Sequence, residues 1–435
     1  MRFARAGAVA RLAGVYPGWW VAVGACLSLG LAAGMSFWAF GLFVAPLEAE
    51  FGWSRSVIAA ATSLTLLVSG CASPLVGRLV DRYQPRAVIL IGSVGTAAGY
   101  LLLTRIEQLW QLFALLGLVA FFRTWIFYIP FTTLITRWFS RRRATAMGIA
   151  TSGFGLGGLV FLPLMAEVLS AVGWRVAFAV AALLVVVING VFLLVTRDEP
   201  PARWVDYDVS DGPTSRAPVE GLWQFGDVKA IVRAPVFWLL AAGFAFFFFA
   251  QWAFLFHGPQ FLEHAGLSSR HAALVFSVSA GLGVLLRLSS GWAIDQVRRF
   301  ELLAAAVLSI MALALLVLSL GTSAPLLAAF VLLWGIGSGV GPALEPILVG
   351  RLFGRKHYGT VYGILDGMDT TVSIPGPYLG GLIFDLTGTY RPVLGLYALA
   401  FTAGAAGFLL IARLAAGGAP QQAPSAAGQP APVAL

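Results

Sequence analysis

The sequence predicts an all-α integral membrane protein in which 12 transmembrane helices form two pseudo-symmetric six-helix bundles. Of its 435 residues, 59% are hydrophobic and 11% are charged, whereas a soluble domain carries roughly 25% charged residues. Twelve apolar stretches are long enough to span a bilayer, since an α-helical span needs about 20 residues. Residues of the first half also recur in the second half at a nearly constant offset, which indicates a duplicated membrane unit.

The expected spans follow one another along the chain and are separated by short polar turns. In the first half they cover about residues 18–46, 55–79, 84–104, 109–137, 144–170 and 174–196. In the second half they cover about residues 234–262, 268–293, 300–320, 324–350, 359–384 and 391–414. The run that begins at Gly18 is about twice as long as a signal-peptide core of about 7–15 residues, so we interpret it as a retained first span.

The repeat supports a division into two halves of the same topology. At an offset of 214 residues, the matched pairs are Gly52 and Gly266, Ser54 and Ser268, Gly77 and Gly291, Asp81 and Asp295, Arg137 and Arg351, Phe139 and Phe353, and Arg141 and Arg355. The offset becomes 215 for Gly148 with Gly363 and for Gly173 with Gly388. Two parallel membrane halves with a site between them are the plan of a secondary transporter.

The distribution of basic residues predicts the orientation. Alternate loops, counted from the N-terminus, carry 21 of the 28 Lys and Arg residues, and the opposite loops carry five. The positive-inside rule therefore predicts that both termini are cytoplasmic, in the cell inner (plasma) membrane. The expected segments are a cytoplasmic N-terminus at 1–17, bundles at 18–197 and 233–414, a proline-containing cytoplasmic linker at 198–232 and a disordered cytoplasmic tail at 415–435.

Several classes of function are excluded by composition. The net charge of +9 lies in short clusters without a nucleic-acid-binding motif. Cys26 and Cys71 lie in apolar spans and the four histidines lack metal-ligand spacing, so we expect no disulfide, metal or cofactor. Because the sequence shows no catalytic nucleophile paired with a general base, we expect that the protein is not an enzyme. The expected protein is a monomer whose partners are the lipid bilayer, protons and a small organic anion.

The turn after the second span carries a signature. Residues 77–86, which read Gly-Arg-Leu-Val-Asp-Arg-Tyr-Gln-Pro-Arg, resemble the G-x-x-x-D-R-x-G-R-[RK] signature of the major facilitator superfamily. Gly77, Asp81 and Arg82 have a degenerate copy that includes Gly291 and Asp295. Glycine permits close helix approach, and an aspartate can face a helix N-terminus or an arginine. The resemblance implies a cytoplasmic latch that stabilises an outward-open state; the alternative is an ordinary charged turn.

Four further stretches narrow the resemblance. Residues 51–55 open the second span, and residues 137–143 join the fourth and fifth spans and are followed by 147–150 and 152–153. Residues 173–175 open the sixth span, and residues 384–390 close the eleventh. Together they resemble the bacterial monocarboxylate-transporter-like branch of the superfamily, which includes oxalate–formate exchangers. The resemblance covers about residues 16–414 and implies carriage of a small carboxylate.

Arg287 is the first candidate for substrate binding, because a charge at bilayer depth is costly and marks functional sites. It precedes Gly291 by four residues and Asp295 by eight, an order that resembles the span-eight arginine that pairs with substrate carboxylate in this branch. A guanidinium offers a fork of donors that suits a carboxylate. The alternative is a structural arginine bonded to helix carbonyls or to an internal acid. Gly283, where relatives commonly carry a polar residue, offers no second hydrogen bond.

Three other residues are candidates for lining the site. Arg123 lies near the middle of the fourth span, and a second buried arginine indicates either a dianionic substrate or an internal ion pair. Tyr128 resembles a tyrosine that lines the cavity in the family; the alternative is a packing aromatic. His257 precedes the helix-breaking pair Gly258 and Pro259 in the seventh span. Because broken helices often line transporter cavities, it is a candidate for substrate binding or proton relay, with a structural role as the alternative.

Three deeply placed acids are candidates for proton coupling: Glu345 in the tenth span, and Asp366 and Asp369 in the eleventh. Asp366 and Asp369 are three residues apart and share a helix face. If acids neutralise Arg123 and Arg287, one acid remains to take up a proton, and Asp369 is the first choice. Some relatives carry a span-eleven lysine as a second carboxylate ligand; none is present here, which favours proton coupling over anion exchange.

The leading hypothesis is a secondary active transporter that moves a small organic carboxylate by alternating access, coupled to protons. One alternative is a proton-driven exporter of drugs or hydrophobic compounds, favoured if the three acids rather than Arg287 dominate the cavity. Another is a carboxylate anion exchanger. A non-transporting membrane sensor is a remote alternative, because the linker and tail are too short and too proline-rich to supply a folded signalling domain.

Overall fold

The computed structural model describes residues 16–140, 142–201, 225–297 and 299–416, and the regular elements in these ranges are all helices. The first half contains α2 (Gly18–Ala33), η3 (Gly34–Trp38), α3 (Phe40–Phe51), α4 (Arg55–Arg82), α5 (Pro85–Leu103), α6 (Leu109–Thr124), α7 (Tyr128–Trp138) and α8 (Arg143–Val195). The second half contains α9 (Val228–Arg233), α10 (Pro235–His264), α11 (Ser269–Asp295), α12 (Phe300–Leu320), α13 (Ala324–Phe353), α14 (Tyr358–Ser373), α15 (Pro375–Thr387) and α16 (Arg391–Ala416). Most of the expected N-terminus, linker and tail lies outside the described residues.

The helices account for the twelve predicted crossings. Ten helices of the described ranges are long and apolar enough to cross a membrane. One of them, α8, has 53 residues and would measure about 80 Å if straight, about twice the full thickness of a bilayer. It is interrupted at Gly173, whose φ of 83° is left-handed, and contains two crossings. Another crossing is divided between α14 and α15, each too short alone. The predicted all-α fold with twelve spans is confirmed.

Three crossings are interrupted along their length. The first passes from α2 to α3 through the π-helical turn η3. The fourth breaks between α6 and α7, where Pro130 has no N–H to donate to the carbonyl of Ile126. The eleventh breaks at Ile374, directly before Pro375. Irregular backbone at membrane depth is tolerated where it is buried in protein or lines a cavity, so these breaks indicate where a site lies.

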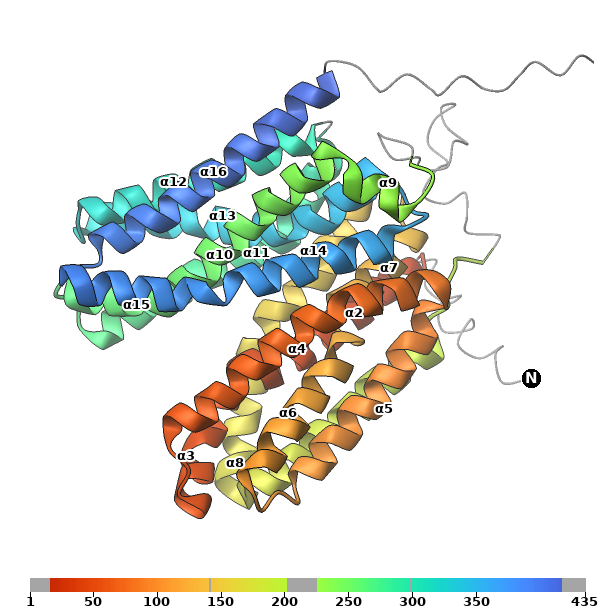
Figure 1. Cartoon of the computed structure of the whole chain (residues 1–435), viewed down its shortest axis with the longest axis vertical. Coiled ribbons are helices and arrows are strands. Elements are labelled where there is room, and N and C mark those ends of the chain that lie inside the picture. The colour runs from red at the N-terminus through yellow and green to blue at the C-terminus, as the bar shows by residue number, and fades with distance from the viewer. Residues whose placement is uncertain (1–15, 141, 202–224, 298, 417–435) are drawn as a thin grey trace, which may run out of the picture.

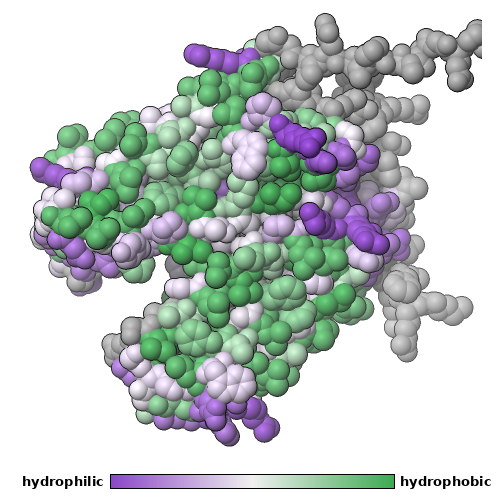
Figure 2. Space-filling model, viewed as in Figure 1, coloured by the Kyte–Doolittle hydropathy of each residue, from purple (hydrophilic) through white to green (hydrophobic). Residues whose placement is uncertain are grey.

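Figure 1 shows two bundles, with α2–α8 below and α10–α16 above. They meet at one end, near α7, and diverge at the other, where α3 and α15 lie. In Figure 2 a cleft separates the bundles at the diverging end, and hydrophobic residues cover their sides while hydrophilic residues gather toward the ends. We call the meeting end the closed end and the diverging end the cleft end.

Glycines let the two bundles approach closely toward the closed end. α4 packs against α14, and a Cβ added at Gly77 would lie 2.1 Å from the carbonyl oxygen of Gly359. α8 packs against α11, and a Cβ at Gly291 would lie 2.5 Å from the Cα of Thr145. Small residues allow helix backbones to come into contact in membranes. These two interfaces, α4–α14 and α8–α11, therefore hold the bundles together.

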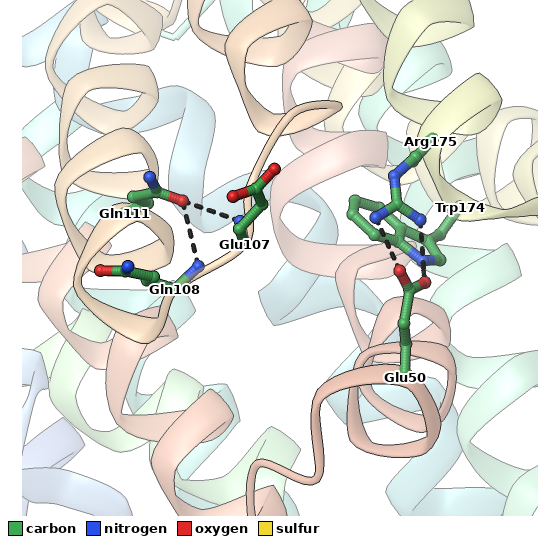
Figure 3. Close-up of polar contacts among 6 residues, drawn as sticks. All are labelled: Glu50, Glu107, Gln108, Gln111, Trp174 and Arg175. Carbon is green, nitrogen blue, oxygen red and sulfur yellow. Dashed lines mark hydrogen bonds and ion pairs between the residues drawn. The ribbon is translucent and has the colours of Figure 1, made fainter.

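At the cleft end of the first bundle, Glu50 joins α3 to the second half of α8 (Figure 3). Nη1 of Arg175 and Nε1 of Trp174 donate to one carboxylate oxygen at 2.9 and 2.7 Å, and Nη2 of Arg175 lies 2.6 Å from the other. These hydrogen bonds, that from Arg175 first, lower the pKa of Glu50. Figure 3 also shows Gln111, whose side-chain oxygen accepts from the backbone N–H of Gln108 at 3.0 Å and closes the start of α6.

Candidate functional site

A cavity of about 360 Å³ lies between the two bundles. Its walls come from η3, α4, α6, α7 and α8 on one side and from α10, α11, α13, α14 and α15 on the other. Six of the seven predicted binding and coupling residues line it: Arg123, Tyr128, Arg287, Glu345, Asp366 and Asp369. Helices separated by more than two hundred residues thus place two arginines and three acids around one space.

Arg287 lies on α11 and is 9% exposed. Its Nε donates to the carbonyl of Gly339 at 2.9 Å and its Nη2 to that of Ser338 at 2.7 Å, both on α13. Its Nη1 donates to the carbonyl of Thr151 at 2.9 Å, which lies on α8 in the other bundle. In this conformation Arg287 therefore makes the hydrogen bonds to helix carbonyls that form the predicted alternative to substrate binding. A guanidinium has five N–H donors, so each terminal nitrogen retains one for a ligand.

Arg123 lies in the last turn of α6 and is 3% exposed. Its Nη2 donates to Oγ of Ser69 at 2.8 Å, and its Cζ lies 5.3 Å and 5.2 Å from the ring centroids of Phe37 and Phe127. Within the described ranges its Nη1 has no hydrogen-bond partner. A buried donor without a partner carries its full desolvation cost. Of the two predicted roles, a ligand-binding arginine fits this geometry better than an internal ion pair.

Of the three acids, Asp366 stands alone, whereas Glu345 and Asp369 lie side by side. Asp366 accepts from Oγ of Ser73 at 2.6 Å, a hydrogen bond that joins α14 to α4 across the bundles. Glu345 and Asp369 are 2% and 3% exposed, and the carboxyl of Glu345 lies next to that of Asp369. No N–H or hydroxyl donor of the described residues reaches either oxygen of Asp369. Two carboxyl groups in contact must share a proton to be stable together, so this pair has the chemistry of a proton-binding group.

Tyr128 begins α7, directly after the break in the fourth crossing. It lines the cavity beside Phe127, Thr124 and Arg123. These four residues have the spacing i, i+1, i+4 and i+5, which keeps their side chains on one side of the fourth crossing.

His257 is not brought to the cavity. It is 7% exposed, and Nε2 donates to the carbonyl of Pro377 at 2.7 Å while Nδ1 lies 3.2 Å from Oε1 of Gln260. A Cβ at Gly380 would lie 2.7 Å from the ring. The imidazole thus packs on a glycine of α15 and ties α10 to that helix, and it is not among the described residues that line the cavity.

Both signature aspartates cap helices of the opposite bundle. Asp81 accepts hydrogen bonds from the backbone N–H groups of Gly359 and Thr360 at 2.9 and 2.7 Å. Asp295 accepts from those of Ala144 and Thr145 at 2.7 and 3.0 Å. Each carboxylate satisfies free donors in the first turn of α14 or α8, where the helix dipole favours negative charge. Gly77 and Gly291 make room for this contact, whereas Arg82 is exposed, with its guanidinium over the ring of Tyr83.

Three aromatic side chains of the cavity wall are missing from the sequence prediction. Phe37 of η3, Phe154 of α8 and Trp252 of α10 form a triangle whose ring centroids are 5.5 to 5.6 Å apart. Phe37 and Trp252 are stacked at 15° across the two bundles. Because aromatic residues make up 13% of the chain, no sequence signal separates these rings from those that face lipid. Their direction depends on the rotation of each helix.

Comparison with known proteins gives a consistent assignment. The family model described as Major Facilitator Superfamily matches residues 26–367. Monocarboxylate transporter 11 of Mus musculus is 29% identical over 388 residues, covering 86% of this chain and 82% of its own length. Monocarboxylate transporter 11 of Homo sapiens is 30% identical over 390 residues, with 86% and 78% covered. An MFS-type transporter of Gibberella moniliformis is 26% identical over 384 residues, with 86% and 88% covered.

Solved structures show the same arrangement of helices. The crystal structure of FucP, a Major Facilitator Superfamily transporter in the outward conformation, matches with a TM-score of 0.67 and covers 90% of this chain and 98% of FucP. The sequence identity is 14%, so this likeness concerns the fold alone.

Proposed function

Because the chain belongs to the Major Facilitator Superfamily and is a multi-pass membrane transporter rather than an enzyme, we propose that it moves a small organic carboxylate by alternating access, coupled to protons. The observation that carries this proposal is the cavity between the bundles, in which two buried arginines face three acids. Ionisable groups at membrane depth are costly and mark substrate or proton pathways. The names of the monocarboxylate transporter relatives support an organic anion as the substrate.

The conformation fits one half of a transport cycle. The aspartate contacts hold the bundles together at the closed end, and the cleft separates them at the other. By the positive-inside rule the closed end is cytoplasmic, so the cleft faces outward and both termini are cytoplasmic. Asp81 and Asp295, with Gly77 and Gly291, then form the latch that stabilises the outward-facing state. Release of the substrate inside requires the α4–α14 and α8–α11 contacts to separate.

The Glu345–Asp369 pair is the proposed proton site. Both carboxyl groups are buried beside the cavity, and two adjacent carboxylates cannot both ionise cheaply. A proton on the pair lowers the electrostatic cost of moving the empty or loaded cavity through the membrane. Asp366 differs, because Ser73 already donates to it.

The test is uptake by the purified full chain in liposomes, with a panel of labelled carboxylates and an imposed pH gradient. Uptake of at least one carboxylate is expected to rise as the pH on the cleft side falls. Arg287→Lys replaces a forked donor by a point charge, and losing one charge-assisted hydrogen bond of about 1.5–3 kcal/mol weakens the apparent affinity about 10- to 150-fold. The matched control is Arg105→Lys at an exposed position. Wild-type uptake by Arg287→Lys removes Arg287 from the site, and uptake of no carboxylate refutes the proposed substrate class.

Two rival activities give different results in the same liposomes. An anion exchanger ignores the pH gradient and moves a carboxylate only against a second internal anion. A proton-driven exporter of hydrophobic compounds draws support from the aromatic lining of the cavity and from the three Arg287 donors already bonded to carbonyls. It would move an uncharged aromatic dye and leave carboxylates behind.

A further inference from the structure

We infer that the substrate is an aryl carboxylate, in which Arg123, besides Arg287, binds the carboxylate and the aromatic ring packs against Phe37, Phe154 and Trp252. This inference rests on the proposed carboxylate transport and names the substrate class. Two features of the cavity carry it: a held arginine with a free terminal nitrogen, and a cluster of rings that begins beside that arginine.

Arg123 is prepared to receive a carboxylate. The rings of Phe37 and Phe127, with centroids 5.3 and 5.2 Å from Cζ, and the hydroxyl of Ser69, 2.8 Å from Nη2, restrain its guanidinium. Its Nη1 is buried and, in the part of the chain that the structure describes, has no acceptor. Among these residues no carboxylate lies within ion-pair distance of Arg123; Asp366 accepts from Ser73 and attracts the guanidinium only from further away. An incoming carboxylate therefore gains a charge-assisted hydrogen bond without first breaking an internal ion pair.

The ring cluster continues directly from Arg123. Phe37 contacts the guanidinium and also stacks on Trp252, with centroids 5.6 Å apart and planes at 15°. Phe154 completes the triangle at 5.5 Å from Phe37 and 5.6 Å from Trp252, with its plane tilted by 54° and 66°. Offset-stacked and edge-to-face neighbours are the two arrangements that aromatic rings prefer. A ligand ring in this corner of the cavity meets both faces and edges, while a carboxylate one or two bonds away reaches Arg123.

The cavity is larger than a short-chain acid requires. Its volume of about 360 Å³ lies within the range of pockets that hold drug-sized ligands. A two- or three-carbon acid, with four to six non-hydrogen atoms, leaves much of the aromatic wall in contact with water. Phenylacetate, with ten non-hydrogen atoms, covers it and buries apolar surface from both partners.

Binding of a matched ligand series to the purified full chain in detergent, by calorimetry, tests the inference on the wild-type protein. Phenylacetate is expected to bind more tightly than cyclohexylacetate, which has nearly the same size without a π system, by about three- to tenfold. It is expected to bind at least about tenfold more tightly than its neutral amide, phenylacetamide, and than acetate. Equal affinity for phenylacetate and cyclohexylacetate, or tighter binding of acetate, overturns the inference.

Two variants test separately whether Arg123 binds the carboxylate and whether Trp252 contacts the ring of the ligand. Arg123→Lys is expected to weaken phenylacetate binding about tenfold or more and to leave phenylacetamide binding unchanged. Trp252→Leu is expected to reduce the preference for phenylacetate over cyclohexylacetate to about one. The control is Trp110→Leu, at a ring that is 64% exposed. An Arg123→Lys variant that is monodisperse in gel filtration and binds phenylacetate like the wild type overturns the carboxylate assignment.

The outcome is separable from that of the proposed function. If lactate is taken up with protons but phenylacetate neither binds nor is transported, the aryl class is wrong and carboxylate transport stands. If phenylacetate binds with the predicted selectivity but no carboxylate crosses the membrane, the site stands and the transport proposal fails. If Arg123→Lys does not yield folded protein, the ligand series on the wild type still decides the substrate class.

Discussion

Replacing Gly77 by alanine tests whether the two helix interfaces hold the closed end together. A Cβ at this position would lie 2.1 Å from the carbonyl oxygen of Gly359 and 3.1 Å from the Cα of Thr360, whereas ordinary contact begins at 3.4 Å. Both neighbours are backbone atoms, so no side-chain rotation relieves the overlap. α4 and α14 must therefore separate by about 1.3 Å to reach van der Waals contact.

The size of the effect follows from the hydrogen bonds at Asp81, which lies one helical turn further along α4. A displacement of about 1.3 Å lengthens its contacts with the N–H groups of Gly359 and Thr360, now 2.9 and 2.7 Å, beyond hydrogen-bonding distance. Each bond to a charged acceptor contributes about 1.5–3 kcal/mol. Loss of both costs at least about 3 kcal/mol, which lowers the ratio of closed to open molecules by roughly 100-fold or more.

The assay is a pulsed electron paramagnetic resonance distance between spin labels at Tyr83→Cys and Lys356→Cys, two exposed positions on opposite bundles at the closed end. The exposed Cys71 is replaced by serine. The Gly77→Ala variant is expected to show a second, longer distance that is weak in the wild type. The control is Gly190→Ala, where a Cβ has no neighbour within 4 Å. Identical distance distributions for Gly77→Ala and Gly190→Ala would refute the reasoning.

Three further predictions concern single groups. Glu50→Gln should lower the melting temperature slightly at pH 7, because a carboxyl whose folded pKa is lowered stabilises the fold above its unfolded value of about 4.3. This difference between variant and wild type should shrink as pH falls below about 4.3 and through the lower folded pKa; an unchanged difference at low pH contradicts this. Asp369→Asn or Glu345→Gln should flatten the pH dependence of uptake, and retention of pH-driven accumulation by both variants moves the coupling site elsewhere. Cysteines at Lys356 and Glu263 should be labelled from opposite sides of the membrane, and labelling from the same side contradicts the topology.

The spans, and the two aspartates that make contacts at the closed end, could be predicted from the sequence because each depends on local rules. A bilayer demands about 20 apolar residues in a helix, so hydropathy locates the crossings. Asp81 and Asp295 could be singled out because residues 77–86 resemble the family signature and because Gly77 and Asp81 recur as Gly291 and Asp295 at the repeat offset. The break between α14 and α15 is marked by Pro375.

The orientation of side chains around the cavity could not be predicted in the same way. Counting acids against arginines predicts an acid beside Arg287, but the donors of Arg287 reach carbonyls of two helices that only the fold brings near. The position of His257 depends on the packing of its ring against Gly380 of α15. Phe37 reaches Arg123 and Trp252 because the π-helical turn η3 rotates it. The rotation of a helix and the position of an irregular turn cannot be predicted from the hydropathy of the sequence.

The duplicated frame links the cavity to the latch. Ser73 and Arg287 are 214 residues apart, and Thr151 and Asp366 are 215 apart, so the Ser73–Asp366 and Arg287–Thr151 hydrogen bonds occupy equivalent places at the α4–α14 and α8–α11 interfaces. On each helix the aspartate of the latch follows eight residues later, which is about 12 Å along the axis. A change in the cavity that alters the Ser73–Asp366 or the Arg287–Thr151 bond acts on an interface that also carries an aspartate contact of the closed end. In the proposed cycle, occupancy of the cavity and separation of the closed end therefore act on the same two helix pairs, α4–α14 and α8–α11.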